Sequence, residues 1–219
     1  MESEIDASPD SGAVTALFSA VILTLAFTGG FIIMTIELLG GRILAPYFGS
    51  SIYVWGSIIT VFMISLSLGY LLVGRLSLVN PSLTRYGTFF LLAAVALLPT
   101  IFLGQSIMDG VFLRIEDPRY GSLVASALLF FFPTVVLGMI APYSVRLLVT
   151  HRHHSGQVAG GLYFASTLGS ALGTLATSFY LVLYFEVNHI LLSMVTILIA
   201  AGIIAIGTRF LTGHETKAS

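Results

Sequence analysis

Residues 14–39 read VTALFSAVILTLAFTGGFIIMTIELL, an apolar run in which Glu37 is the one charged residue. About 20 consecutive apolar residues are enough for a helix to cross the hydrocarbon core of a bilayer. The chain before this run, MESEIDASPD, is acidic and lacks the basic start of a cleavable signal peptide. We therefore expect the run to remain in the protein as its first membrane helix.

Five similar runs follow at about 52–76, 83–104, 122–148, 158–183 and 189–210. Hydrophobic residues make up 57% of the chain and charged residues only 9%, values outside the usual range of water-soluble globules. The sequence therefore predicts an all-α, polytopic integral membrane protein with six transmembrane helices. We expect this domain at 13–210, an acidic disordered tail at 1–12 and a short tail at 211–219. The lipid bilayer would then be the main partner of its surface.

The distribution of cationic residues predicts the topology. With six helices both termini share one face of the membrane, and that face would carry Arg75, Arg85, Arg146, Arg152, Arg209 and Lys217. The other face would carry Arg42, Arg114 and Arg119. The positive-inside rule then predicts a multi-pass protein of the cell membrane with cytoplasmic N- and C-termini. A formal net charge of −1 gives no reason to expect a nucleic-acid partner.

The one long connection, residues 105–121, reads QSIMDGVFLRIEDPRYG. It mixes apolar with charged residues, so a short helix in the membrane interface and an irregular loop both remain open.

The segment 37–56, ELLGGRILAPYFGSSIYVWG, holds the candidates for a ligand or ion site. A carboxylate such as Glu37 is costly in an apolar helix unless it is paired. A chain bend at the two glycines that follow would let Arg42 pair with it. Glu37 could bind a cation or carry a proton at the outer end of a cavity, or a pair with Arg42 or another helix could only fix the packing. We prefer the packing role, because a charge near a helix end costs less. Tyr47, Tyr53 and Trp55 are expected in an interfacial aromatic belt, ahead of a role in stacking on a ligand.

The run at 158–183 predicts close helix packing. Gly169 and Gly173 form a GxxxG pattern, and Ser166, Ser170 and Thr174 repeat at the same four-residue spacing. Small residues at this spacing let a neighbouring helix approach closely. Gly29, Gly30, Pro99, Pro133 and Pro142 interrupt other runs, and such interruptions either line a binding site or only shape the helices.

The residue types give little sign of catalysis. The chain has no cysteine, and it shows no nucleophile elbow, zinc-protease motif or phosphate loop. His151, His153 and His154 cluster in a short connection, where a solvated loop is a better interpretation than a metal site. We therefore expect no catalytic residue, metal or cofactor in this chain.

Four stretches carry a resemblance to a known family. They are ELLGGRILAPYFGSSIYVWGSII at 37–59, SLSLGYLLVGRLS at 65–77, PTVVLGMIAPYSVRLL at 133–148 and GQVAGGLYFASTLGSALGTLATSFYLV at 156–182. They resemble the membrane region of the spermidine-synthase-like membrane proteins, the fused major-facilitator-like and spermidine synthase family, over about 30–183. The resemblance implies half of a major-facilitator-like fold. In fused members an aminopropyltransferase-like domain follows the last helix, whereas here only 208–219 follow, so no catalytic residue carries over.

These observations leave three functions open. The first is a non-catalytic membrane subunit that holds, or passes substrate to, a separately encoded aminopropyltransferase-like enzyme. The second is a small transporter for a polyamine or another organic cation, which would need a homodimer to form a two-half pathway. A polycation would require several buried carboxylates, and Glu37 alone is available. The third is a structural subunit of a membrane complex. We expect a homo-oligomer.

Overall fold

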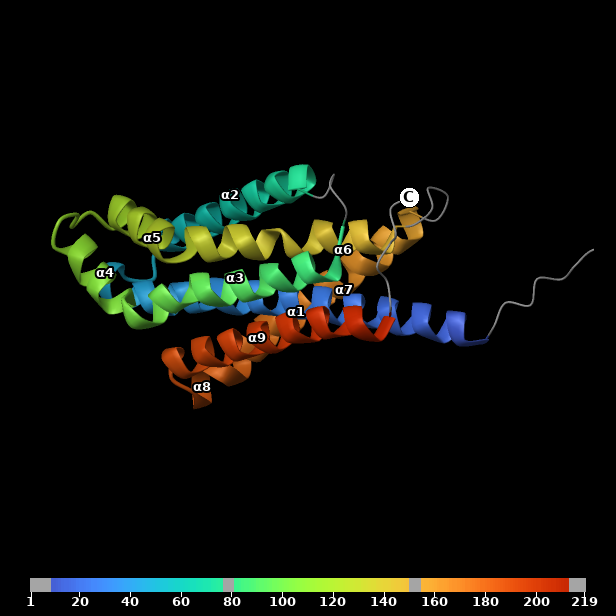
Figure 1. The fold of residues 1–219 in the computed structure, drawn as a ribbon. Coiled ribbons are helices and arrows are strands. Elements are labelled where there is room, and N and C mark those ends of the chain that lie inside the picture. The colour runs from blue at the N-terminus through green and yellow to red at the C-terminus, as the bar shows by residue number, and fades with distance from the viewer. Residues whose placement is uncertain (1–8, 77–80, 150–154, 213–219) are drawn as a thin grey trace, which may run out of the picture.

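The computed structural model describes residues 9–76, 81–149 and 155–212, and every regular element in these ranges is a helix (Figure 1). The elements are α1 (Pro9–Phe48), α2 (Ile52–Leu76), α3 (Leu83–Phe102), α4 (Gly104–Phe112), α5 (Pro118–Gly138), α6 (Ile140–Leu148), α7 (Ser155–Ala176), the π-helix η2 (Thr177–Leu181), α8 (Val182–Tyr184) and α9 (Val187–Thr212).

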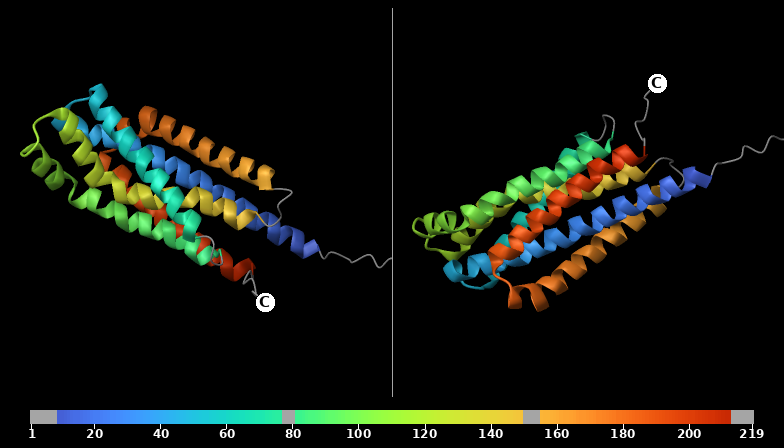
Figure 2. Two further views of the ribbon diagram at one scale, coloured as in Figure 1. Left: turned by 90° about the horizontal axis from the view of Figure 1, so that it is seen from above. Right: turned by 60° about the horizontal axis from the view of Figure 1, so that its bottom comes forward.

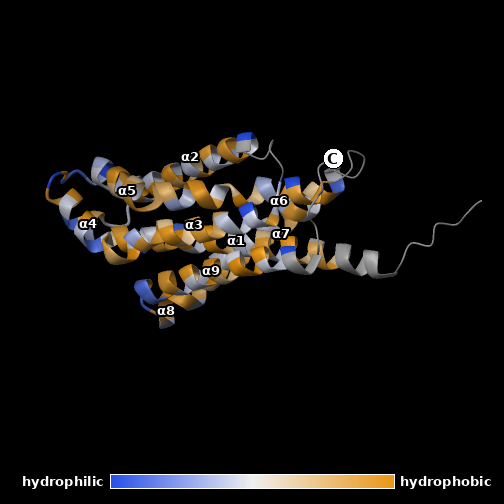
Figure 3. Ribbon diagram, viewed as in Figure 1, coloured by the Kyte–Doolittle hydropathy of each residue, from blue (hydrophilic) through white to orange (hydrophobic). Residues whose placement is uncertain are grey.

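Six helical segments are long and apolar enough to cross a membrane, which confirms the predicted all-α, six-helix class. They are Ala16–Phe48, Ile52–Arg75, Leu83–Phe102, Pro118–Leu148, Gly156–Tyr184 and Val187–Arg209. They lie side by side as one bundle. The start of α1 and the end of α9 lie at one end of it, and α4 and α8 lie at the other (Figures 1 and 2). Hydrophilic residues gather at both ends, and the lengths of the helices are apolar (Figure 3).

The first helix differs from the prediction at its end. We expected it to end near Leu39 and the chain to bend at Gly40 and Gly41, but α1 continues to Phe48. Both glycines stay helical and make room for aromatic rings. A Cβ at Gly40 would lie 3.2 Å from the ring of Phe130, and one at Gly41 would lie 2.6 Å from the ring of Trp55. The glycines therefore serve close packing here, and the predicted bend is wrong.

Other boundaries also shift. Because α1 begins at Pro9, residues 9–12 are helical although we placed them in a disordered tail, while residues 1–8 lie outside the described part. The predicted helix at 122–148 is two helices, α5 and α6, which meet at Met139. The long connection contains the short helix α4, so the irregular-loop alternative is wrong for 104–112.

The last two predicted helices are longer than expected. The run expected at 158–183 begins at Ser155 and continues through α7, η2 and α8 to Tyr184. The last helix, α9, extends over Val187–Thr212 and so includes two residues that we assigned to the C-terminal tail.

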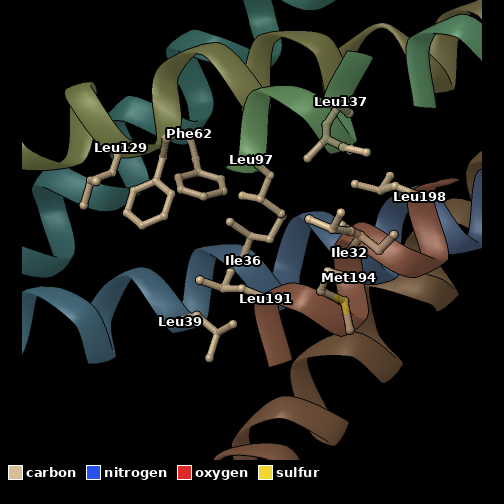
Figure 4. Packing of buried hydrophobic residues seen from close by; sticks show 14 of the residues in the cluster. Ile32, Ile36, Leu39, Phe62, Leu97, Leu129, Leu137, Leu191, Met194 and Leu198 are labelled. Carbon is tan, nitrogen blue, oxygen red and sulfur yellow. The ribbon is translucent and has the colours of Figure 1, made fainter. Parts of the chain in front are cut away.

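The buried apolar side chains meet between the helices (Figure 4). Ile32, Ile36 and Leu39 of α1 belong to this cluster of buried side chains. The residues labelled around them are Phe62 of α2, Leu97 of α3, Leu129 and Leu137 of α5, and Leu191, Met194 and Leu198 of α9. The long helix α1 is therefore central to the bundle.

Three helix pairs pack most extensively: α1 with α7, α2 with α5, and α3 with α9. Each pair meets at glycine. A Cβ at Gly169 of α7 would collide with the carbonyl oxygen of Phe27, and one at Gly69 of α2 would collide with that of Val135. A Cβ at Gly87 of α3 would lie 2.6 Å from the carbonyl oxygen of Gly202. Backbone therefore touches backbone in all three pairs.

We predict that Gly169→Ala destabilises the protein, because its new methyl group overlaps the backbone of α1. The expected loss is about 1–3 kcal/mol in the free energy of unfolding, the usual cost of overpacking. Gly160→Ala is the matched control on the same helix, since no atom lies within 4 Å of a Cβ there. It should leave stability unchanged, or raise it by up to about 1 kcal/mol through helix propensity. Unfolding in detergent measures both, and equal midpoints would contradict the close contact.

Candidate functional site

Glu37 lies well inside α1. It is eleven residues before the helix end at Phe48, about 16 Å at 1.5 Å per residue. We preferred a packing role for Glu37 because we placed it near a helix end, where a charge costs little. The continuous helix removes that reason, and an ionisable residue within a membrane helix points to function by default.

Arg42 is not the partner of Glu37. In a continuous helix, residues five apart are separated by about 140° around the axis, so the two side chains leave α1 in different directions. Arg42 is exposed. Within the described ranges, the one carboxylate that lies within 4 Å of a basic side chain's nitrogen is that of Glu186, 3.6 Å from His189 on the surface. Among these residues the Glu37 carboxyl also has no hydrogen-bond partner, so the pair that we expected is absent.

The Glu37 carboxyl borders a cavity of about 140 Å³ between α1, α2, α7 and the junction of α5 with α6. The cavity follows α1 from Ala26 to Glu37. Its lining consists of Ala26, Gly29, Gly30, Ile33, Met34, Glu37, Leu66, Tyr70, Leu137, Gly138, Ile140, Ala141, Ser166 and Ser170. Of these residues Glu37 alone carries a carboxyl group, and most of the others are apolar or very small.

Hydroxyl groups bring hydrogen-bonding capacity to the same cavity. Ser166 and Ser170 reach it from α7, and the Ser170 hydroxyl donates to the Gly30 carbonyl oxygen at 3.2 Å. Tyr70 reaches it from α2. The two serines were predicted as packing residues, and the structure places them against Gly30 and in the lining of the same cavity.

A backbone carbonyl is a further acceptor at the cavity. Pro142 has no N–H and cannot donate the helical hydrogen bond to the carbonyl oxygen of Gly138, four residues earlier. Gly138 lines the cavity and is the last residue of α5. The interruption between α5 and α6 therefore offers backbone polarity where Glu37 lies, as broken helices do in transporter binding sites.

The segment after the break is held firmly. Tyr143 of α6 accepts a hydrogen bond from the Ser82 N–H at 2.9 Å. The hydroxyls of Ser144 and Tyr86 are 2.7 Å apart, and the rings of Tyr86 and Tyr143 stack with centroids 5.9 Å apart. These contacts fix α6 against α3 and so fix one wall of the cavity.

The break at Pro133 has a different outcome. Pro133 leaves the Leu129 carbonyl without its helical donor. Thr100 of α3 supplies a replacement, since its hydroxyl donates to that oxygen at 2.8 Å. Two prolines of the predicted fourth helix each free a carbonyl. The carbonyl freed by Pro133 accepts a hydrogen bond from a neighbouring helix, and the one freed by Pro142 belongs to a residue that lines the cavity.

The remaining ligand candidates lie away from the cavity. Tyr47 donates a hydrogen bond to the Asp109 carboxylate at 2.6 Å and contacts Phe112, which joins the end of α1 to α4. The guanidinium of Arg119 lies over the ring of Tyr53 at 4.8 Å, and Trp55 packs against α1. Of the five candidates, Glu37 alone borders the cavity.

The packing candidates of α7 lie against α1. A Cβ at Gly173 would collide with the carbonyl oxygen of Phe31. Thr174 donates to the carbonyl of Ser170 in its own helix at 2.9 Å. One turn further, Thr177 donates to the hydroxyl of Thr35 at 3.0 Å, at the start of the π-helix η2.

Two other features offer no site. In the described ranges no group of three or more His, Cys, Asp or Glu side chains could hold a metal ion, and His151, His153 and His154 lie outside those ranges. A larger groove of about 330 Å³ lies between α1 and α9, but its walls are apolar apart from Thr24 and Thr28. Both threonine hydroxyls are bonded to carbonyls of their own helix.

Sequence reasoning missed Tyr70 and Gly138. Tyr70 is a hydroxyl-bearing residue inside an apolar run, which is a weak signal, and nothing in the sequence shows that it meets Glu37. The role of Gly138 follows from the position of Pro142, which we identified as a break without assigning the carbonyl that it frees.

Comparisons with protein-family models, curated proteins and solved structures find no match to this chain. The fold establishes a multi-pass, all-α membrane protein. The resemblance to the spermidine-synthase-like family and the half-transporter architecture remain predictions.

We predict that Thr100 and Pro133 are energetically coupled. Thr100→Val should cost about 1 kcal/mol of unfolding free energy, because it leaves the Leu129 carbonyl without a donor. In a Pro133→Ala background the restored N–H at position 133 can bond to that carbonyl, so the same change should cost markedly less. Unfolding free energies of the four proteins give the coupling. Additive effects would contradict the assigned hydrogen bond.

Proposed function

We propose that this chain binds a small organic cation within the cell membrane and transports it. The observation that carries the proposal is Glu37, a carboxyl with no partner among the described residues, about three helical turns inside α1 and bordering a cavity. Interrupted helices and a midmembrane polar site are features of transporters. Six helices equal half of a major-facilitator transporter, so the working unit in this proposal is a homodimer.

The proposal places both termini in the cytoplasm. Arg75, Arg85 and Arg146 are exposed near the end of the bundle where α1 begins and α9 ends. Arg114 and Arg119 at the opposite end stand among the acidic residues Asp109, Glu116 and Asp117. Under the positive-inside rule the first end faces the cytoplasm. The acidic end would then attract cations from outside.

A second candidate is a non-catalytic membrane subunit that holds, or passes substrate to, a separately encoded aminopropyltransferase-like enzyme. The four stretches that resemble spermidine-synthase-like membrane proteins support it. The exposed arginines at the end shared by the termini also support it, because they offer a charged surface to a soluble partner.

Uptake into proteoliposomes tests the transport proposal. We expect wild-type protein to accumulate one or more of a panel of labelled monoamines and diamines. Glu37→Gln should lower this rate at least about tenfold, because it removes the charge that pairs with the cation. Glu186→Gln makes the same chemical change at an exposed site and should transport at the wild-type rate. Transport would be excluded if no amine accumulated, and an unchanged uptake rate in Glu37→Gln would contradict the assignment of Glu37 to the site.

Purification from native membranes in mild detergent tests the second candidate. We expect mass spectrometry to find an aminopropyltransferase-like protein in stoichiometric amount, held by charge and therefore lost at high salt. Recovery of a homodimer alone would contradict the subunit function. Recovery within a larger assembly without such an enzyme would instead favour a structural subunit of a membrane complex.

A further inference from the structure

We propose that the cavity beside Glu37 selects a singly charged primary ammonium with a short hydrocarbon chain, and rejects diamines and polyamines. The inference rests on the proposed function and narrows its substrate class. The charges, acceptors and dimensions of the cavity support it.

The charge of the cavity matches one cation. Glu37 supplies the single carboxyl group among the lining residues, and none of them carries a positive charge. Tyr70 is the other ionisable group, and a tyrosine is neutral at pH 7. A second ammonium drawn into this space would be buried without a counter-charge, which is strongly unfavourable away from water. A zwitterionic lipid headgroup meets the same obstacle, because its phosphate would have no cationic partner.

The acceptors match a primary ammonium. Such a group has three N–H donors, as in the lysine side chain. The residues that line the cavity and carry acceptors are Glu37, Ser166, Tyr70 and Gly138, the last through the carbonyl that Pro142 cannot bond. A quaternary ammonium has no donor and is usually held by an aromatic cage, whereas Tyr70 is the one aromatic residue in the lining.

The size and walls match a short chain. The cavity volume of about 140 Å³ is less than half of about 300 Å³, the lower end for pockets that hold drug-sized ligands, so its ligand must be smaller. An ammonium with a few methylene groups is of this size. The walls against which a chain would lie are apolar side chains: Ile33, Met34, Leu66, Leu137 and Ile140.

The test compares two ligands of equal chain length. Protein in phosphatidylcholine nanodiscs is titrated calorimetrically at pH 7 with n-butylammonium, 1,4-diaminobutane and sodium chloride in separate runs. We expect n-butylammonium to bind at least about tenfold more tightly than the diamine, and we expect no binding of sodium. Glu37→Gln should weaken the binding of n-butylammonium at least about tenfold, as expected when a charged hydrogen-bond partner is lost. Glu186→Gln should leave this affinity unchanged.

Pro142→Ala gives a second variant that does not threaten the fold. It restores an N–H that can bond to the Gly138 carbonyl, which is then occupied and cannot accept from the ligand. The binding of n-butylammonium should therefore weaken several-fold, while the unfolding midpoint stays equal or rises. Unchanged binding by this variant would show that the Gly138 carbonyl does not bind the ligand. Tighter Glu37-dependent binding of the diamine would overturn the single-charge inference and leave cation transport standing. Failure of wild-type protein to bind any amine would overturn both.

Repeating the titration in nanodiscs that contain phosphatidylethanolamine distinguishes a free amine from a lipid ammonium. An unchanged affinity supports a free amine as the ligand. A markedly lower apparent affinity would mean that the lipid headgroup occupies the cavity, which would overturn the inference of a small free amine.

Discussion

The contact of backbone with backbone at glycine is the constraint on which the remaining structure depends. Lipid tails are as apolar as leucine, so helices in a bilayer are not driven together by the hydrophobic effect and associate through close packing. The three most extensive helix pairs all meet this way, at Gly169, Gly69 and Gly87. The bundle is therefore held by shape, and a single methyl group at one of these contacts changes the distance between two helices.

The same small residues explain why the cavity exists. Gly30 brings α1 against the backbone of Ser166, and Gly69 and Gly138 bring α2 against α5. Once the backbones touch, they keep the helices at fixed separations, and residues such as Gly29 and Ala141 have no side chain long enough to fill the space that remains. The cavity is thus bounded by rigid contacts.

The hydropathy of the sequence was sufficient for the class and number of helices, and for both ends of α2 at Ile52 and Leu76. It was not sufficient for the end of α1, because glycine permits both a bend and a close approach. Which of these occurs at Gly40 and Gly41 depends on whether a ring from another helix packs there, and Phe130 is far away in sequence. Glu37 was identified from its charge alone. Its surroundings require the relative positions of four helices, which the sequence pattern does not contain.

The two prolines of the fourth membrane segment show how a structural helix break differs from a functional one. Both remove an N–H and leave a carbonyl without its helical donor. At Pro133 the cost is offset, because Thr100 donates to the freed oxygen of Leu129. At Pro142 the freed oxygen belongs to Gly138, in the wall of the cavity that Glu37 borders. In a bilayer, irregular backbone is tolerated where it is buried in protein or lines a polar cavity. The freed carbonyl at Pro133 is satisfied by protein, whereas the one at Pro142 belongs to a residue that lines the same cavity as Glu37.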